Sequence, residues 1–371
     1  MTKRFTVRDM KLDSRSPALA GSLRLGLRLG LLVALVVSLA ACPNKSRNES
    51  VKKSNEGTKA YGQKQFETAI ESYLKAVDLW KDNHVAWYGL TGAYIGKKDY
   101  VKASDAMQNA VTIAPEQAMY QMVYGYTLYE KAIFQAREDQ ARRENKKVEE
   151  VQPDLTAVNF EKPRQYLQKA IELNPELWRA HYYLGRIYRD TDKPKEAAEA
   201  LTKSLSFAPT IPEPWVALGE LYRKWDYTDQ ALAVAQQGAA VVPGSNEVSD
   251  IWYVAGMAYD DKRLDDKAIE SFDKALESRP DNHKAKFQRG QAYFRKGEFS
   301  KAKKDLEEFA KSGGSSVEFA KQQASKMLLD IAAKSAMQNN TPPESPGGAA
   351  PGGKMTPEQM LEDAKRKKKG G

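Results

Sequence analysis

Cysteine and histidine are scarce in this chain. Its 371 residues include one cysteine, Cys42, and three histidines, His84, His181 and His283. With one cysteine no disulfide can form within the chain, so packing alone must stabilise the fold. The histidines are far apart and belong to no His-x-x-x-His or His/Cys cluster, the spacing that metal sites use. We therefore expect neither a metal nor a cofactor.

Motifs typical of enzymes are missing as well. Gly96-Lys97 lacks the preceding glycine of a phosphate-binding loop, and no serine stands in a Gly-x-Ser-x-Gly context. Nothing singles out a catalytic pair among the many carboxylates. The sequence thus predicts a protein that is not an enzyme, and an enzyme remains the remote alternative.

A concentrated excess of positive charge is also absent from the body of the chain. The formal net charge is +9, but residues 1–41 hold seven basic and two acidic residues, and residues 354–371 hold six basic and three acidic ones. The remainder has 45 basic and 44 acidic residues. Because nucleic-acid binding needs a basic face that neutralises phosphates, we do not expect a nucleic-acid partner.

The N-terminal region has the composition of a secretory signal. Basic residues precede an uncharged apolar run over 29–41, which is too short for a spanning helix. The series Leu39-Ala40-Ala41-Cys42 resembles the bacterial lipobox, whose cysteine receives a diacylglycerol and an acyl chain such as palmitate and becomes the first mature residue. The resemblance implies that residues 1–41 are removed and that Cys42 is the lipidation site. The alternative is a stray or buried cysteine beside an ordinary signal peptide, and either Met1 or Met10 could be the start.

Helical repeats dominate what the chain does contain. Prolines 175, 209 and 243 are 34 residues apart, and counting back 31 residues from each places the same residue types at the same positions. One unit holds His181, Leu184, Gly185, Tyr188, Ala197, Leu201 and Pro209. Positions 4, 7, 8 and 11 share one face of a first helix, and positions 20 and 24 share one face of a second. Small residues at 8 and 20 allow close packing, and large rings such as Trp215 and Trp252 at position 4 should be buried between units.

This pattern, W-x-x-L-G-x-x-Y followed by Ala and Pro, resembles the tetratricopeptide repeat (TPR) family. The resemblance implies an all-α, right-handed superhelix of about seven helix-turn-helix units with a C-terminal capping helix. The predicted units are 50–83, 84–117, 118–177, 178–211, 212–248, 249–282 and 283–316. A tether over 42–49 precedes them, and an insertion over 131–161 lies within the third unit. Its first helix should run to near Glu150, and the insertion should project from one rim. A capping helix over 317–338, a disordered linker over 339–353 and a basic tail over 354–371 follow.

In this family, partners bind in the groove lined by the first helices, at positions that can be carried onto this chain. The residues so implied are Tyr88, Met122, Tyr126, Tyr129, Arg179, Tyr182, Arg186, Arg189, Tyr253, Asp260, Asp261, Phe287 and Phe294. Three arginines gather in unit four, and Asp250, Asp260 and Asp261 gather in unit six, which would suit an extended partner of matching polarity. The alternative is that the tyrosines are framework residues common to the family and the charges an ordinary solvated face.

The resemblances together imply a lipid-anchored scaffold for protein–protein interaction in a bacterial cell-envelope machine of the pilus, secretin or gliding-motility type. Its partners would be envelope proteins or extended peptide segments. Because Pro43, not aspartate, follows the cysteine, we expect the periplasmic face of the outer membrane. The alternative within the binding class is an adaptor that recruits peptidoglycan hydrolases or proteases.

Overall fold

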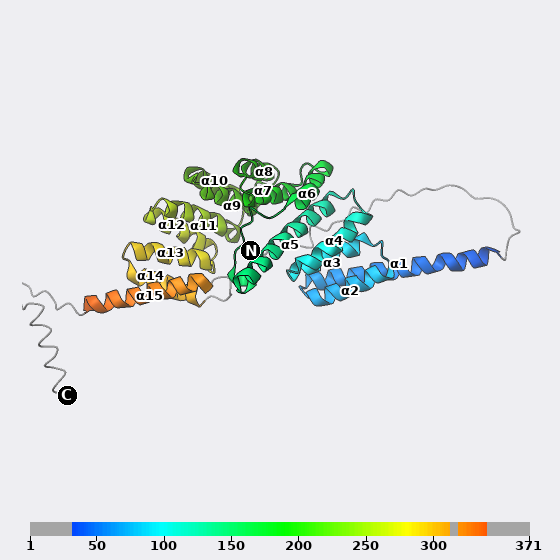
Figure 1. The fold of residues 1–371 in the computed structure, drawn as a ribbon, viewed down its shortest axis with the longest axis horizontal. Coiled ribbons are helices and arrows are strands. Elements are labelled where there is room, and N and C mark those ends of the chain that lie inside the picture. Colours follow the sequence, from blue (N-terminus) through cyan, green and yellow to red (C-terminus); the bar gives the residue numbers. More distant parts are fainter. Residues whose placement is uncertain (1–31, 312–317, 340–371) are drawn as a thin grey trace, which may run out of the picture. The chain divides into compact units, whose positions relative to one another are not determined.

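The computed structural model describes residues 32–311 and 318–339, and Figure 1 shows the course of the chain. The regular elements in these ranges are helical. They are α1 (Leu32–Gly62), α2 (Phe66–Leu79), α3 (His84–Gly96), α4 (Tyr100–Ile113), α5 (Ala118–Glu144), a 3-10 turn (Val148–Glu150), α6 (Glu161–Leu173), α7 (Trp178–Asp190), α8 (Pro194–Phe207), α9 (Pro212–Lys224), α10 (Thr228–Val241), α11 (Ser245–Asp261), α12 (Asp265–Ser278), α13 (His283–Arg295), α14 (Phe299–Ala310) and α15 (Glu318–Asn339).

The chain forms two compact units, residues 1–325 and 326–371, and the following concerns the first. Its helices α1 to α14 form seven pairs, as the repeat pattern predicts. Each helix packs against the next, and most first helices also contact the first helix of a neighbouring pair: α1 contacts α3, α5 contacts α7, and α7, α9, α11 and α13 follow in series. We call this row of first helices the inner row. The predicted all-α repeat architecture is confirmed.

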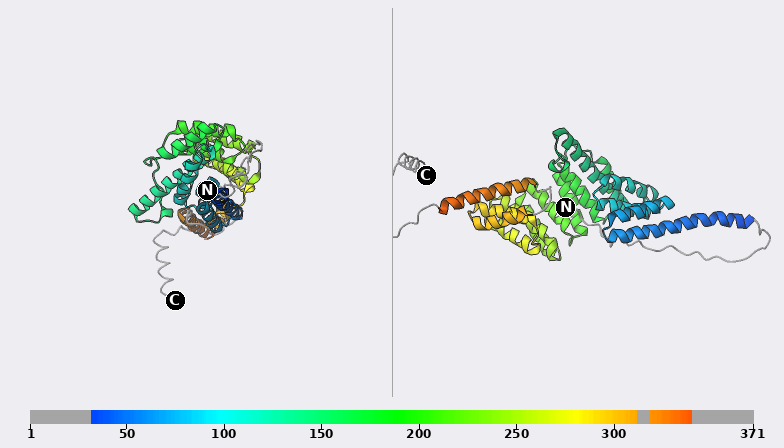
Figure 2. Two further views of the ribbon diagram at one scale, coloured as in Figure 1. Left: turned by 90° about the vertical axis from the view of Figure 1, so that its right-hand side faces the viewer. Right: turned by 90° about the horizontal axis from the view of Figure 1, so that it is seen from below.

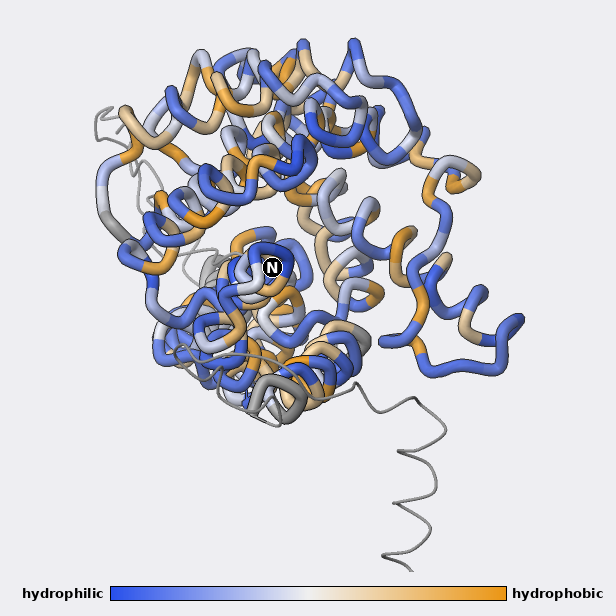
Figure 3. The backbone as a smooth tube through the Cα atoms, turned by 90° about the vertical axis from the view of Figure 1, so that its left-hand side faces the viewer, coloured by the Kyte–Doolittle hydropathy of each residue, from blue (hydrophilic) through white to orange (hydrophobic). Residues whose placement is uncertain are grey.

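Small side chains let the two helices of a pair approach closely. The alanines at position 20, among them Ala69, Ala197 and Ala268, are fully buried. Glycine at position 8 serves the same purpose, because a Cβ added to Gly256 would lie 2.4 Å from the ring of Phe272. Figure 3 shows the matching alternation of hydrophilic and hydrophobic residues along the helices. A long apolar core between stacked pairs follows, since no pair alone can bury its apolar face.

The two tryptophans predicted to lie between units differ in burial. Trp215 is 7% exposed and its indole N–H donates to the Pro209 carbonyl at 2.7 Å. Trp252 packs against the clusters on both sides of it but is only half-buried. The prediction is therefore confirmed for Trp215, whereas Trp252 lies between units without being fully enclosed.

The third unit differs from its predicted outline. Helix α5 ends at Glu144, where Asn145 adopts a left-handed conformation with φ +50°, so the helix does not reach Glu150. Part of the insertion packs back instead of projecting: Val151 and Phe160 are buried, and the Phe160 ring lies 5.3 Å from that of Tyr129. Of the third unit, only the charged end of α5 and its following turn extend from the bundle (Figure 2).

Two boundaries also differ from the predicted ones. Helix α11 begins at Ser245, four residues before the predicted sixth unit, and α1 includes the predicted tether 42–49, which is helical. Helix α15 closely matches the predicted segment 317–338, and its capping role stays a prediction. Residues 1–31 of the predicted signal and nearly all of the predicted linker and basic tail lie outside the described residues. Over the described ranges, no helix combines the length and apolarity that crossing a bilayer requires.

Candidate partner-binding surface

The aromatic residues predicted to line the groove divide by burial. Met122 and Tyr129 are fully inaccessible and Tyr126 is 8% exposed, so these three belong to the core. The reason is the long α5: Phe160 from the returning segment covers Tyr129, and Tyr183 of α7 stacks on Tyr126 with 4.6 Å between ring centroids. Phe287 is likewise buried, against Phe309. The prediction that these residues offer surface to a partner is wrong.

Half-buried rings remain at the same register in three units. Tyr88, Tyr182 and Tyr253 stand at position 5 of units two, four and six, and each of these residues is half-buried. Tyr88 stacks on Tyr120 at 4.9 Å, and Tyr253 lies 6.0 Å from Phe272. Phe294, at position 12 of the seventh unit, is also half-buried. The inner row therefore presents spaced aromatic side chains that are held in place by other rings.

The arginine cluster of unit four is paired within the chain. The Arg186 guanidinium lies 3.3 Å from Glu130 and stacks over the ring of Tyr129 at 4.9 Å. It also faces the rings of Tyr182 and Tyr183, each at 6.0 Å. Such contacts stabilise a partly desolvated cation. Arg179 stacks on Trp178 at 4.5 Å.

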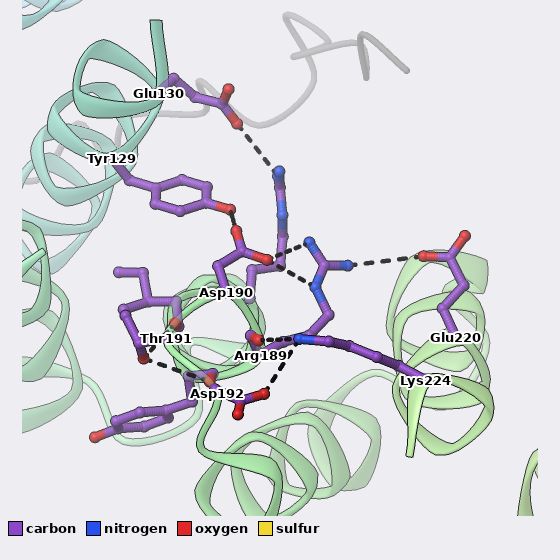
Figure 4. A network of polar contacts seen from close by, with 11 residues as sticks. Tyr129, Glu130, Arg189, Asp190, Thr191, Asp192, Glu220 and Lys224 are labelled. Carbon is purple, nitrogen blue, oxygen red and sulfur yellow. Dashed lines mark hydrogen bonds and ion pairs between the residues drawn. The ribbon is translucent and has the colours of Figure 1, made fainter. Parts of the chain in front are cut away.

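A second set of contacts joins α5, α7 and α9 (Figure 4). The Tyr129 hydroxyl donates to the Asp190 carboxylate, which also accepts from Arg189 Nε at 2.9 Å. Burial raises the pKa of Tyr129, so its hydroxyl stays protonated and acts as the donor. Arg189 then reaches Glu220 of α9 at 3.7 Å, and Lys224 donates to the Arg189 carbonyl at 3.2 Å. We call these residues, together with Arg186 and Glu130, the central network.

The acidic residues of unit six are also matched by arginines. Arg223 binds Asp261 through two nitrogens at 2.7 and 3.0 Å. Arg279 contacts Asp250 at 2.6 Å, and Arg295 binds Asp260. These charges already have internal partners, so a charged partner segment would have to exchange contacts with them, and their role in partner binding stays a prediction.

A polar hollow lies beside these pairs, between α9 and α11. Its volume is about 490 Å³, and its seven lining residues are all charged, three basic and four acidic. Glu220, Arg223 and Asp261 take part in both the hollow and the pairs just described. A polar segment that bound here would have to exchange contacts with existing ion pairs.

Two other predicted features have simple outcomes. Cys42 lies within α1, and its lipidation stays a prediction. Among the described residues, no three His, Cys, Asp or Glu side chains gather as a metal site would require.

The sequence interpretation missed the partners of the arginines. Glu130 and Asp190 stand at position 13 of units three and four, and Asp261 stands at the same position of unit six. Position 13 faces the groove in the family pattern, so acidic residues there signalled internal pairing with arginines at positions 9 and 12. Tyr183, which stacks on Tyr126, carried no such signal in the sequence.

The comparisons with known proteins agree with this geometry. The tetratricopeptide repeat family matches residues 55–118, 159–210 and 253–317, and no curated protein sequence matches the chain. A solved tetratricopeptide repeat protein from Parabacteroides merdae is 13% identical with a TM-score of 0.53, over 78% of this chain and 99% of that one. A chain of the APC/C hetero-tetramer Cut9-Hcn1 is 14% identical with a TM-score of 0.51, over 79% of this chain and 48% of that one.

Identities this low show a shared fold alone. The Pseudomonas aeruginosa protein pilF is 19% identical over 63% of this chain and 96% of that one, with a TM-score of 0.40, from which we infer nothing further. Between the matched ranges lie two segments without a family match, the long α5 with its insertion and the stretch from α9 to the start of α11. The chain belongs to the tetratricopeptide repeat family, whose members act in protein–protein interaction.

Proposed function

We propose that this protein is a lipid-anchored scaffold of the bacterial cell envelope that holds an extended partner segment along its inner row. The observation that carries the proposal is the recurrence of half-buried Tyr88, Tyr182 and Tyr253 at one register position. Tyrosines that are pre-positioned by neighbouring rings lose little entropy on binding and are typical of interface hot spots. The fold is typically that of a non-enzymatic scaffold, which fits the same role.

The proposed anchor is Cys42. Pro43 lies in the interior of α1, where a proline lacks the N–H that a helix needs. Removal of residues 1–41 would place Pro43 in the first turn, where that N–H has no intrahelical partner to lose. Acyl chains on Cys42 would each contribute about 0.8 kcal/mol per buried CH₂, and several chains make a firm anchor. We propose the periplasmic face of the outer membrane as the location.

The proposed role is in the assembly or function of an envelope machine of the pilus, secretin or gliding-motility type. Membrane fractionation of the parent protein and Cys42→Ser tests the anchor. We expect the parent in the outer-membrane fraction and the variant unprocessed or released. Equal membrane association of both would contradict the lipid anchor but leave the inner-row proposal intact.

Partner capture tests the inner row. Envelope partners are first identified by crosslinking to the anchored parent, and their binding to Tyr88→Ala and Tyr253→Ala is then measured. Each truncation should weaken capture by about tenfold or more, the loss expected of a hot-spot tyrosine. Tyr227→Ala is the matched control. Tyr227 is 52% exposed and is the N-cap residue of α10, a second helix, so it lies outside the inner row. Parental capture by both inner-row variants, with unchanged melting, would rule out this surface.

A further inference from the structure

Four units share a hydrogen bond that ties each to the turn before it. The side chain at position 4 reaches the carbonyl six residues earlier. The pairs are Trp87 Nε1 to Lys81 O at 2.8 Å, Gln121 Nε2 to Pro115 O at 2.6 Å, His181 Nε2 to Pro175 O at 2.9 Å and Trp215 Nε1 to Pro209 O at 2.7 Å. Gln121 is the member of this set without a ring.

The rings at position 4 also cover the second helix of their own unit. The Trp215 indole lies against Gly238 of α10, where an added Cβ would be 2.8 Å from it, and the His181 ring lies 5.6 Å from Phe207 of α8. The amide of Gln121 keeps the hydrogen bond but is too short to cover α6 in this way. A pocket of about 860 Å³ is found at this place, between α4, the start of α5 and α6. Val111, Pro115 and Tyr166 supply its apolar wall, together with the stem of Gln121.

One polar atom at this pocket lacks a partner. The orientation of the Gln121 amide is set by the Pro115 carbonyl, because a carbonyl oxygen can only accept and so must face the Nε2 donor. The Oε1 acceptor of the same amide is then left for another donor. Oε1 is buried and accepts no hydrogen bond from any described residue. Buried acceptors are nearly always satisfied in native proteins, so a donor from outside would stabilise this site.

The rim of the pocket is positively charged. Lys162 lines it, is exposed, and makes no ion pair with a described residue; its ammonium only faces the Tyr124 ring at 5.9 Å. The one acidic residue of the lining, Glu161, is already bound by Arg164. The second lysine of the lining, Lys169, forms an ion pair with Glu172 at 3.4 Å. A negatively charged ligand would therefore find an available cation at this rim.

We infer that this pocket binds a tryptophan side chain within an acidic segment of a partner protein. The indole would lie where the chain's own indoles lie in units two and five, its N–H would donate to Gln121 Oε1, and a neighbouring carboxylate would pair with Lys162. The pocket is formed largely by the second helices α4 and α6 and by the turns at their ends. It is thus a second binding surface, distinct from the inner-row tyrosines and from the lipid anchor, although Gln121 itself belongs to α5.

Calorimetric titration of the full chain with the acetylated peptide EDWDE tests this inference, with EDADE and KKWKK as control peptides. We expect saturable binding of EDWDE, and binding weaker by about tenfold or more for each control, the equivalent of one lost anchor contact. Lys162→Glu should weaken EDWDE and favour KKWKK. Tyr253→Ala, on the inner row, should leave EDWDE binding unchanged, which separates this pocket from the proposed inner-row function.

Two variants fill the pocket. Gln121→Trp supplies the ring that other units carry and should abolish EDWDE binding while raising or preserving the melting temperature. Gln165→Trp places a ring on the exposed rim without altering a buried group, and it tests the pocket even if Gln121→Trp unfolds. The inference is overturned if the parent shows no saturable binding of EDWDE at millimolar concentration, if EDWDE and KKWKK bind equally, or if Gln165→Trp binds EDWDE as the parent does.

Discussion

At both ends of the row of repeat units, the same three residue types join neighbouring pairs. The Ser50 hydroxyl donates to the Ala76 carbonyl at 2.6 Å, and the Asn83 amide donates to Ser50 at 2.9 Å and accepts from the Ala86 N–H at 3.0 Å. Between units six and seven, the corresponding contacts are Ser249 to Ala275 at 2.7 Å, Asn282 to Ser249 at 2.9 Å and Ala285 to Asn282 at 3.2 Å.

The centre is built differently. There, α5, α7 and α9 are joined by the central network of charged and aromatic side chains instead of a buried Ser–Asn pair. Neutral hydrogen bonds between short side chains fix the distance between units and do little else. Charged groups on long side chains can exchange partners, so the centre is where the inner row could respond to a bound segment.

Reversal of Arg186 should cause the largest loss of stability. Arg186→Glu would place a carboxylate beside Glu130 and remove the cation that faces the rings of Tyr129 and Tyr182. Breaking a fully buried pair costs about 3–5 kcal/mol, which sets the upper limit for this part-buried one. Urea unfolding should show this loss, whereas Arg142→Glu, at a side chain of α5 that is 76% exposed, should be nearly neutral. Equal, small effects of both would mean that the Arg186 contacts contribute little to the centre.

Loss of the Tyr129 hydroxyl should have a smaller effect. Tyr129→Phe keeps the ring but removes the donor to Asp190, and hydrogen bonds to charged groups contribute about 1.5–3 kcal/mol. Tyr227→Phe, at an exposed ring, serves as the control in the same unfolding experiment. A neutral Tyr129→Phe would show that Arg189 alone holds Asp190.

The end junctions should respond equally to the same substitution. Asn83→Ala and Asn282→Ala each remove a helix cap and the bond to a buried serine, and cap removal costs about 0.5–2 kcal/mol. Asp99→Ala removes a cap of α4, where the side chain accepts from the Lys102 N–H at 3.0 Å but does not join two units, and it should cost less. Unequal losses at the two ends would contradict their equivalence.

The smallest expected effect is a pH dependence at the junction of units two and three. His84 Nδ1 lies 2.9 Å from the Tyr120 hydroxyl. Burial raises the pKa of Tyr120 to about 12, so this hydroxyl stays neutral over the range considered. Burial lowers the pKa of His84. The unfolded chain therefore binds a proton more readily than the folded one. The stabilisation is present above the unfolded value of about 6.5 and is lost as the pH falls below it.

This dependence is measured as the change in unfolding midpoint between about pH 7.5 and about pH 5.5, which brackets the histidine titration. His84→Gln should reduce the change slightly, by no more than about 0.5 kcal/mol. His283→Gln, at the same position of unit seven but exposed, should leave it unaltered.

The periodic residues made most of the fold predictable. Proline spacing, glycine at position 8 and alanine at position 20 report local packing within one pair, so the pairs and their order followed from them. The candidate surface was less predictable, because Arg186 and Glu130 are 56 residues apart and their pairing depends on how units stack. The burial of Tyr129 depends on a non-repeated segment that folds back over α5, which no repeat pattern describes.

Helix α1 continues without a break from Cys42 into the first repeat unit. With a lipid on Cys42, the eight residues to Ser50 would span about 12 Å at 1.5 Å per residue. A continuous helix fixes the orientation of the repeat units relative to the lipid as well as their distance from it, which a flexible tether would not. The number of residues between Cys42 and Ser50 would then set which side of the inner row faces the bilayer. Adding two residues there would rotate the inner row about the α1 axis by about 200°, at 3.6 residues per turn.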